Sequence, residues 1–207
     1  NPNTLMASVK KIISKNNATF YDYRTKDRVS TRPRIVFFIV FSALCALSFP
    51  TLDDAFISSV LTVQSILVGF SFSVLFFLVS GSTDLNIKDP SLEVLDRIKR
   101  INILSKELFF NVAYYNTVTI LSVLIALIFI LPSITFPPIL SNFFNVLVQK
   151  NMNLGEFAVI LGALFSRAFV FLFFIVFIES MYTFYRIVRR VNFYFMEKLD
   201  IQKQEKQ

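Results

Sequence analysis

Four apolar stretches alternate with three polar, basic segments along the chain of 207 residues. The apolar stretches consist mainly of Phe, Leu, Ile, Val, Ser and Ala, and three of them exceed the roughly 20 residues that a helix needs to cross a bilayer. The first stretch is shorter. The pattern predicts an all-α fold, a four-helix transmembrane bundle with spans over residues 35–49, 55–79, 109–131 and 154–181.

The distribution of charge predicts how these spans are oriented. Every Lys and Arg except Lys150 and Arg167 lies in residues 1–34, 81–108 or 185–207. Because cationic segments stay on the cytoplasmic side, both termini are expected inside, in a multi-pass protein of the cell inner membrane. The chain then divides into a basic cytoplasmic N-terminal segment (1–34), a transmembrane domain (35–181) and a cytoplasmic C-terminal helix and tail (182–207).

Two of the basic segments also carry a helical pattern. After Asp89-Pro90-Ser91, apolar residues recur on one face as far as Leu108, which predicts an amphipathic helix over 90–108 that leads into the third span. The fourth span continues inward in the same way. These two helical extensions either pack on each other or lie along the membrane surface. On the outer side, the apolar segment 139–148 is too short to span and predicts an interfacial helix.

Composition narrows the chemistry that this chain can perform. It has no His, a single Cys and four Gly, with 55% hydrophobic residues and a net charge of +7. No Gly-rich phosphate loop or paired carboxylate lies within the spans, so we expect no enzymatic activity, no cofactor and no metal. The positive charges flank apolar spans, which favours anionic phospholipid as their partner and argues against direct binding of nucleic acid.

Arg167 is the cation that falls inside an apolar stretch. Counted from Leu154, it lies thirteen residues into its span, about 20 Å from the outer end. The same count predicts that the polar residues of the other spans lie at its level, and these are Asn116, Thr119, Ser71 and Ser42. Two interpretations stay open: an architectural arginine that bonds backbone carbonyls, or one that lines a water path, a lipid site or an anion site between subunits.

The second span carries a row of small and hydroxylated residues at helical spacing. They are Ser58, Thr62, Ser65, Gly69, Ser73 and Ser80, with Gln64 and Ser71 beside them. Small residues spaced by four allow close helix packing, and a row of hydroxyls can also line a pore. Both interpretations place this face against another helix or a symmetry axis of a homo-oligomer rather than against lipid.

The basic residues of the cytoplasmic extensions are candidates for contact with lipid or a cytoplasmic protein. They are Arg97, Lys99, Arg100, Arg186, Arg189 and Arg190. The positive-inside bias alone accounts for such residues, and docking of an acidic partner is the alternative.

The chain's size, internal termini, four spans and cytoplasmic helical extensions resemble the membrane subunit of the Kiwa anti-phage defence system. The resemblance is architectural and carries over no individual residue. It implies a homo-oligomeric membrane sensor that responds to phage attack and works with a separate cytoplasmic, DNA-binding partner. By geometry alone, we expect that partner to dock near residues 97–106 and 186–198. A non-enzymatic sensor or scaffold is therefore the first hypothesis. A pore-forming ion channel that depolarises the membrane is the alternative.

Overall fold

The computed structural model describes residues 2–21, 30–49, 52–81, 92–130 and 152–204, and the regular structure in these ranges is helical. The helices are α1 (Pro2–Ala18), α2 (Arg32–Ser48), α3 (Asp54–Gly81), α4 (Leu92–Ile130) and α6 (Met152–Gln204). The all-α prediction is confirmed for these ranges. The predicted interfacial helix at 139–148 lies outside them.

The ends of α2 and α3 follow from local sequence. Pro33 occupies the first turn of α2, where its missing N–H costs no hydrogen bond, and the Phe49 N–H closes the helix on the Cys45 carbonyl at 2.8 Å. In α3, the Ile57 N–H bonds the Asp53 carbonyl at 3.0 Å, and the Asp54 carboxylate lies in the first turn, where the helix dipole favours negative charge. Both boundaries agree with the predicted spans.

Two helices run far beyond the length of a membrane span. α4 has 39 residues and α6 has 53, so the predicted helix 90–108 and the third span form one continuous helix, as do the fourth span and the C-terminal extension. Among the residues that the structure describes, three helices are long and apolar enough to cross a membrane, over Asp54–Val79, Val94–Ile130 and Ala163–Ile201. α2, with 17 residues, measures about 25 Å and is shorter than the hydrocarbon layer of roughly 30 Å.

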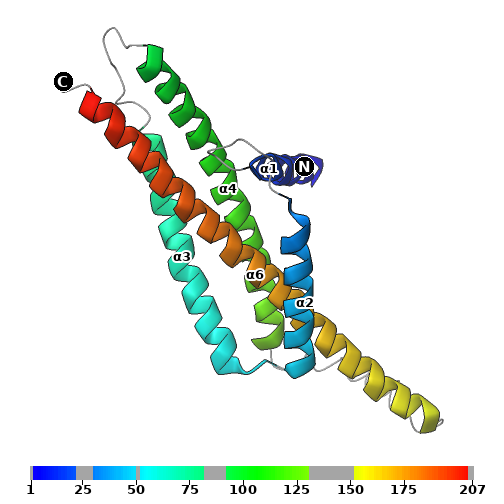
Figure 1. The fold of residues 1–207 in the computed structure, drawn as a ribbon. Helices are drawn as coiled ribbons and strands as arrows, with labels where there is room; N and C mark the ends of the chain where they lie inside the picture. The colour runs from blue at the N-terminus through cyan, green and yellow to red at the C-terminus, as the bar shows by residue number, and fades with distance from the viewer. Residues whose placement is uncertain (1, 22–29, 50–51, 82–91, 131–151, 205–207) are drawn as a thin grey trace.

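The helices are arranged around the central pair α4 and α6 (Figure 1). α3 and α1 pack against α4, while α2 packs against α6. α1 lies crosswise beside the middle of α4, close to the start of α2, and is seen nearly end-on in Figure 1, whereas the Met152 end of α6 projects away from the other helices. We call the end of the bundle where α4 begins and α6 ends the basic end.

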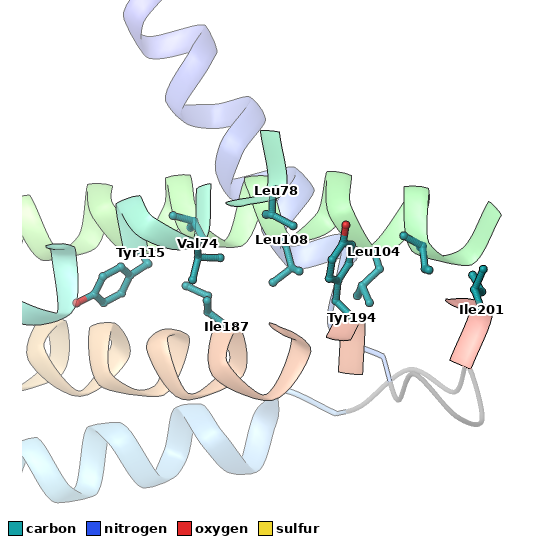
Figure 2. Packing of buried hydrophobic residues seen from close by; sticks show 10 residues of the cluster. Val74, Leu78, Leu104, Leu108, Tyr115, Ile187, Tyr194 and Ile201 are labelled. Carbon is teal, nitrogen blue, oxygen red and sulfur yellow. The ribbon is translucent and has the colours of Figure 1, made fainter. Parts of the chain in front are cut away.

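The apolar core consists of two clusters. The first joins α3, α4 and α6 toward the basic end, and Figure 2 shows its members from Tyr115 to Ile201 interleaved between the helices. The second cluster lies toward the opposite end and includes Ala46, Ile57, Ala126 and Phe173. Because the first cluster contains Ile101, Leu104 and Ile201, the extensions of α4 and α6 pack on each other, which decides between the two arrangements expected from the sequence.

Candidate functional site

The C-terminal end of α1 is anchored on α6 by two arginines. Arg190 donates to the backbone carbonyl of Thr19 at 2.6 Å, and Arg186 donates to the Thr19 hydroxyl at 2.7 Å. The last carbonyls of a helix carry partial negative charge and have no partner within the helix, so cationic donors satisfy them. The same hydroxyl lies 3.0 Å from Oδ1 of Asn111 on α4. Thr19 therefore connects α1 to both central helices.

Phe20 lies beneath two guanidinium groups. Arg186 is centred 3.7 Å from the middle of its ring, and Arg34 of α2 is 4.4 Å away. Arg34 also lies over the rings of Tyr182 and Phe38, at 4.9 and 5.6 Å. Such contacts contribute about 0.5–2 kcal/mol each, most when water is excluded, and Phe20 is only 7% exposed. This aromatic residue thus joins α2 and α6 to the segment that follows α1.

Two carboxylates pair with two of the three arginines. Glu107 of α4 accepts a 2.8 Å bond from Arg190 and a 2.6 Å bond from the Tyr21 hydroxyl. Glu179 of α6 accepts a 3.1 Å bond from the Tyr114 hydroxyl and lies 3.8 Å from Arg34. We call this group the inner cluster; its members are Thr19, Phe20, Tyr21, Arg34, Glu107, Tyr114, Glu179, Tyr182, Arg186 and Arg190.

The contacts of the inner cluster hold helices together. Its cations are engaged by carboxylates, carbonyls and aromatic faces, and its carboxylates are engaged by arginine and tyrosine. Within the described ranges, no three His, Cys, Asp or Glu side chains come together in a way that holds a metal ion. The cluster therefore fixes the position of α1 relative to α2, α4 and α6.

A second polar group, here called the polar layer, lies where the two apolar clusters meet. Gln64 donates to the hydroxyls of Ser122 and Ser180, at 2.9 and 3.4 Å, and the Ser71 hydroxyl bonds Asn116 at 2.8 Å. Ser42 and Thr119 are also buried. Ser71 and Asn116 are thus in direct contact, whereas the role of Ser42, Asn116 and Thr119 at a pore or subunit interface stays a prediction.

Replacing Gln64 with Leu is expected to lower stability only slightly. Hydrogen bonds between helices inside a membrane contribute about 0.6 kcal/mol on average and at most about 1.7, so a loss near 1 kcal/mol is anticipated. Thermal unfolding in detergent is the measurement. Thr62→Val is the control, because the Thr62 hydroxyl bonds the Ser58 carbonyl of its own helix at 2.9 Å and is exposed. A loss several times larger for Gln64→Leu would show that the layer is a principal source of stability.

Arg167 does not belong to the polar layer, and the level predicted for it is wrong. Phe169, two residues further along α6, contacts Phe129 in the last turn of α4, with 6.5 Å between the ring centroids. Asn116 lies almost four turns away along α4, about 20 Å. The side chain of Arg167 is exposed. Counting depth from Leu154 fails because α6 extends past the end of α4 before the two helices pack together.

Replacing Arg167 with Gln is therefore expected to leave the fold intact. An exposed side chain beyond the packed region contributes little, so the melting temperature should change by no more than about 2 °C. The measurement is thermal unfolding of the purified protein in detergent, beside Arg189→Gln at another exposed arginine of α6. A markedly larger fall for Arg167→Gln would indicate that its guanidinium is buried in the assembled protein.

The row of small residues on α3 faces outward. Ser58, Thr62, Ser65, Gly69 and Ser73 are exposed, and a Cβ atom added to Gly69 would meet nothing within 4 Å. The hydroxyls of Ser65 and Ser73 bond carbonyls of their own helix, at 2.8 and 3.2 Å. Within one chain, these residues therefore face away from the other described helices. Contact with a second copy stays a prediction.

The structure separates the six basic candidates into three groups. Arg186 and Arg190 belong to the inner cluster, so their assignment to lipid or a partner is corrected. Lys99, Arg100 and Arg189 are exposed, and Arg97 lies 3.9 Å from Asp200 across the α4–α6 contact.

The residues that the sequence analysis missed are Phe20, Tyr21 and Glu107. The sequence did contain one signal of the inner cluster. The spacing of Glu179, Thr183, Arg186 and Arg190 puts them on one helical face, beside the buried Ile187.

Comparisons with protein-family models, with curated proteins and with solved structures found no match to the chain. The functional interpretation therefore rests on the two polar groups and on the exposed surfaces around them.

Proposed function

We propose that this chain is a non-enzymatic scaffold or sensor of the bacterial inner membrane, oligomeric and coupled to a cytoplasmic effector. α2, α3, α4 and α6 cross the membrane with both termini inside. The basic end is cytoplasmic, and the first turns of α4 pack there on the last turns of α6. The anti-phage role implied by the resemblance to the Kiwa membrane subunit is part of this proposal.

The observation that carries the proposal is the continuity of α4 and α6. Each helix runs without a break from an apolar span into the packed extension at the basic end. A change in helix position within the membrane is therefore transmitted to the extension. The exposed Lys99, Arg100 and Arg189 lie on that extension, where an acidic surface of an effector can bind them.

Charge reversal on the extension tests the coupling to an effector. The double change Lys99→Glu and Arg100→Glu is expected to abolish both recovery of the effector from gently solubilised membranes and protection of cells against phage. The matched control is Lys10→Glu with Lys11→Glu, which makes the same change in charge on exposed residues of α1. The proposal fails if no protein is reproducibly recovered with the unmodified chain, or if protection survives reversal on the extension.

A pore between copies of the chain is the second candidate, and the outward row on α3 favours it. The polar layer is occupied by its own hydrogen bonds, so a water path would run between subunits along Ser58, Thr62, Ser65 and Ser73. Planar-bilayer recording of the purified protein is the test. A pore predicts a conductance that Ser65→Leu reduces, whereas absence of conductance in the unmodified protein excludes it.

A further inference from the structure

An open groove lies between the end of α3 and α4, on the side of α4 away from the inner cluster. Its volume is about 440 Å³, within the range of small-ligand sites. Five apolar side chains form its walls, and Ser105 and Lys106 are at one end. The apolar wall residues are Leu75, Leu78, Val79, Phe109 and Phe110.

The depth of the groove in the membrane follows from where exposed apolar residues lie along α4. Phe109 and Ile128 are both exposed, and the helix between Phe109 and Ile130 measures about 32 Å, close to the thickness of the hydrocarbon layer. Lys106 lies one turn before this apolar stretch. In the proposed orientation, the walls of the groove are in the inner hydrocarbon layer and Lys106 is among the headgroups.

The charge at the mouth of the groove is uncompensated. Glu107 is the neighbouring carboxylate, but it is engaged by Arg190 at 2.8 Å and by Tyr21 at 2.6 Å. Among the residues that the structure describes, no carboxylate pairs with Lys106. An ammonium group beside an apolar groove at this level is complementary to a phosphate that carries acyl chains.

We propose that this groove binds an anionic phospholipid of the inner leaflet. An acyl chain lies along Leu75, Val79 and Phe110, and the phosphate is held by Lys106 with the Ser105 hydroxyl as a further donor. The inference rests on the proposed orientation in the membrane and not on the effector. It assigns the lipid to one place between two helices, where it would set the separation of α3 from α4.

The experiment uses tryptophan fluorescence, because the chain contains no Trp. Phe110→Trp places a single tryptophan in the groove wall. Phe76→Trp, at a side chain 77% exposed and outside the groove, places one at a similar depth on α3. Each full-length variant is reconstituted in phosphatidylcholine bilayers, and quenching by brominated phosphatidylglycerol is compared with quenching by brominated phosphatidylcholine. Val79→Trp provides a second groove reporter if Phe110→Trp does not fold.

We expect brominated phosphatidylglycerol to quench the groove tryptophan about fivefold more than brominated phosphatidylcholine does. The tryptophan of Phe76→Trp should show no such preference. Adding Lys106→Gln should abolish the preference, whereas Lys99→Gln, an exposed lysine two turns away, should leave it.

Four outcomes would overturn the proposal. Equal quenching of the groove tryptophan by both lipids would exclude a site specific for phosphatidylglycerol. If Lys99→Gln abolishes the preference as Lys106→Gln does, the preference comes from the basic surface as a whole. If neither lipid quenches the groove tryptophan while the tryptophan of Phe76→Trp is quenched, a second copy of the chain covers the groove. If neither tryptophan is quenched, the proposed membrane orientation fails as well, which distinguishes that failure from loss of the lipid site alone.

Discussion

Arg190→Gln is expected to lower the free energy of unfolding by about 3 kcal/mol and to release α1 from the bundle. The side chains of Arg190 and Glu107 are only 11% and 19% exposed, and their atoms are 2.8 Å apart. Removing the guanidinium leaves a carboxylate with little access to water and no cationic partner. It also removes the 2.6 Å bond to the Thr19 carbonyl at the end of α1.

Unfolding in detergent and limited trypsin digestion measure the two effects separately. Loss of the anchor should lower the melting temperature and accelerate cleavage after Lys10, Lys11 and Lys15, which are exposed on α1. Arg189→Gln is the matched control, since the neighbouring arginine is exposed and its loss should change stability by no more than about 0.5 kcal/mol. Equal behaviour of the two variants would show that the anchor contributes nothing.

A double-mutant cycle isolates the pair itself. Glu107→Gln combined with Arg190→Gln should cost less than the sum of the single changes, with a coupling energy of about 0.5–3 kcal/mol. Strict additivity would mean that Arg190 acts only through Thr19.

Leu104→Ala is the second change with a large expected effect. Leu104 has no exposed surface and packs among α3, α4 and α6 in the first cluster, beyond the stretch that we assign to the membrane (Figure 2). Truncating a fully buried leucine removes apolar contacts and leaves a cavity, which costs about 2.7–5.0 kcal/mol. We expect the extensions of α4 and α6 to separate while the transmembrane part stays folded.

Hydrogen exchange of the extension is the direct measurement. Protection of the amides from Val94 to Leu108 and from Ile187 to Ile201 should fall in Leu104→Ala. Leu92→Ala makes the same chemical change on the same helix at a side chain 85% exposed, and protection should be unaffected. Unchanged protection in Leu104→Ala would show that the extension does not depend on this packing. If the proposed function holds, recovery of the effector should fall in parallel.

The three helices that are long and apolar enough to cross a membrane were predictable because hydropathy is a local property. Pro33 and Asp54 mark helix starts through their own backbone chemistry, and the apolar residues that recur as far as Leu108 predicted a helix over 90–108 that leads into the third span. These features need no knowledge of neighbouring helices.

Arg167 and the inner cluster were not predictable in the same way. The level of Arg167 depends on where α6 first meets α4, and only the contact between Phe129 and Phe169 reveals it. The pairing of Glu107 with Arg190 depends equally on register between helices far apart in sequence. Arg186 and Arg190 look the same in the sequence as the exposed Arg189, so a basic run alone does not distinguish an anchor from a docking surface.

The length of α6 has a mechanical consequence. Its 53 residues form a rod of about 80 Å, and the hydrogen bond between Gln64 and Ser180 lies near the middle. If the rod tilts about that point, its two ends move in opposite directions by similar amounts, because the arms on either side are of nearly equal length. The movements of the two ends are then coupled, and the contacts that hold α1 near Arg186 restrict the movement of the arm on the side of the basic end.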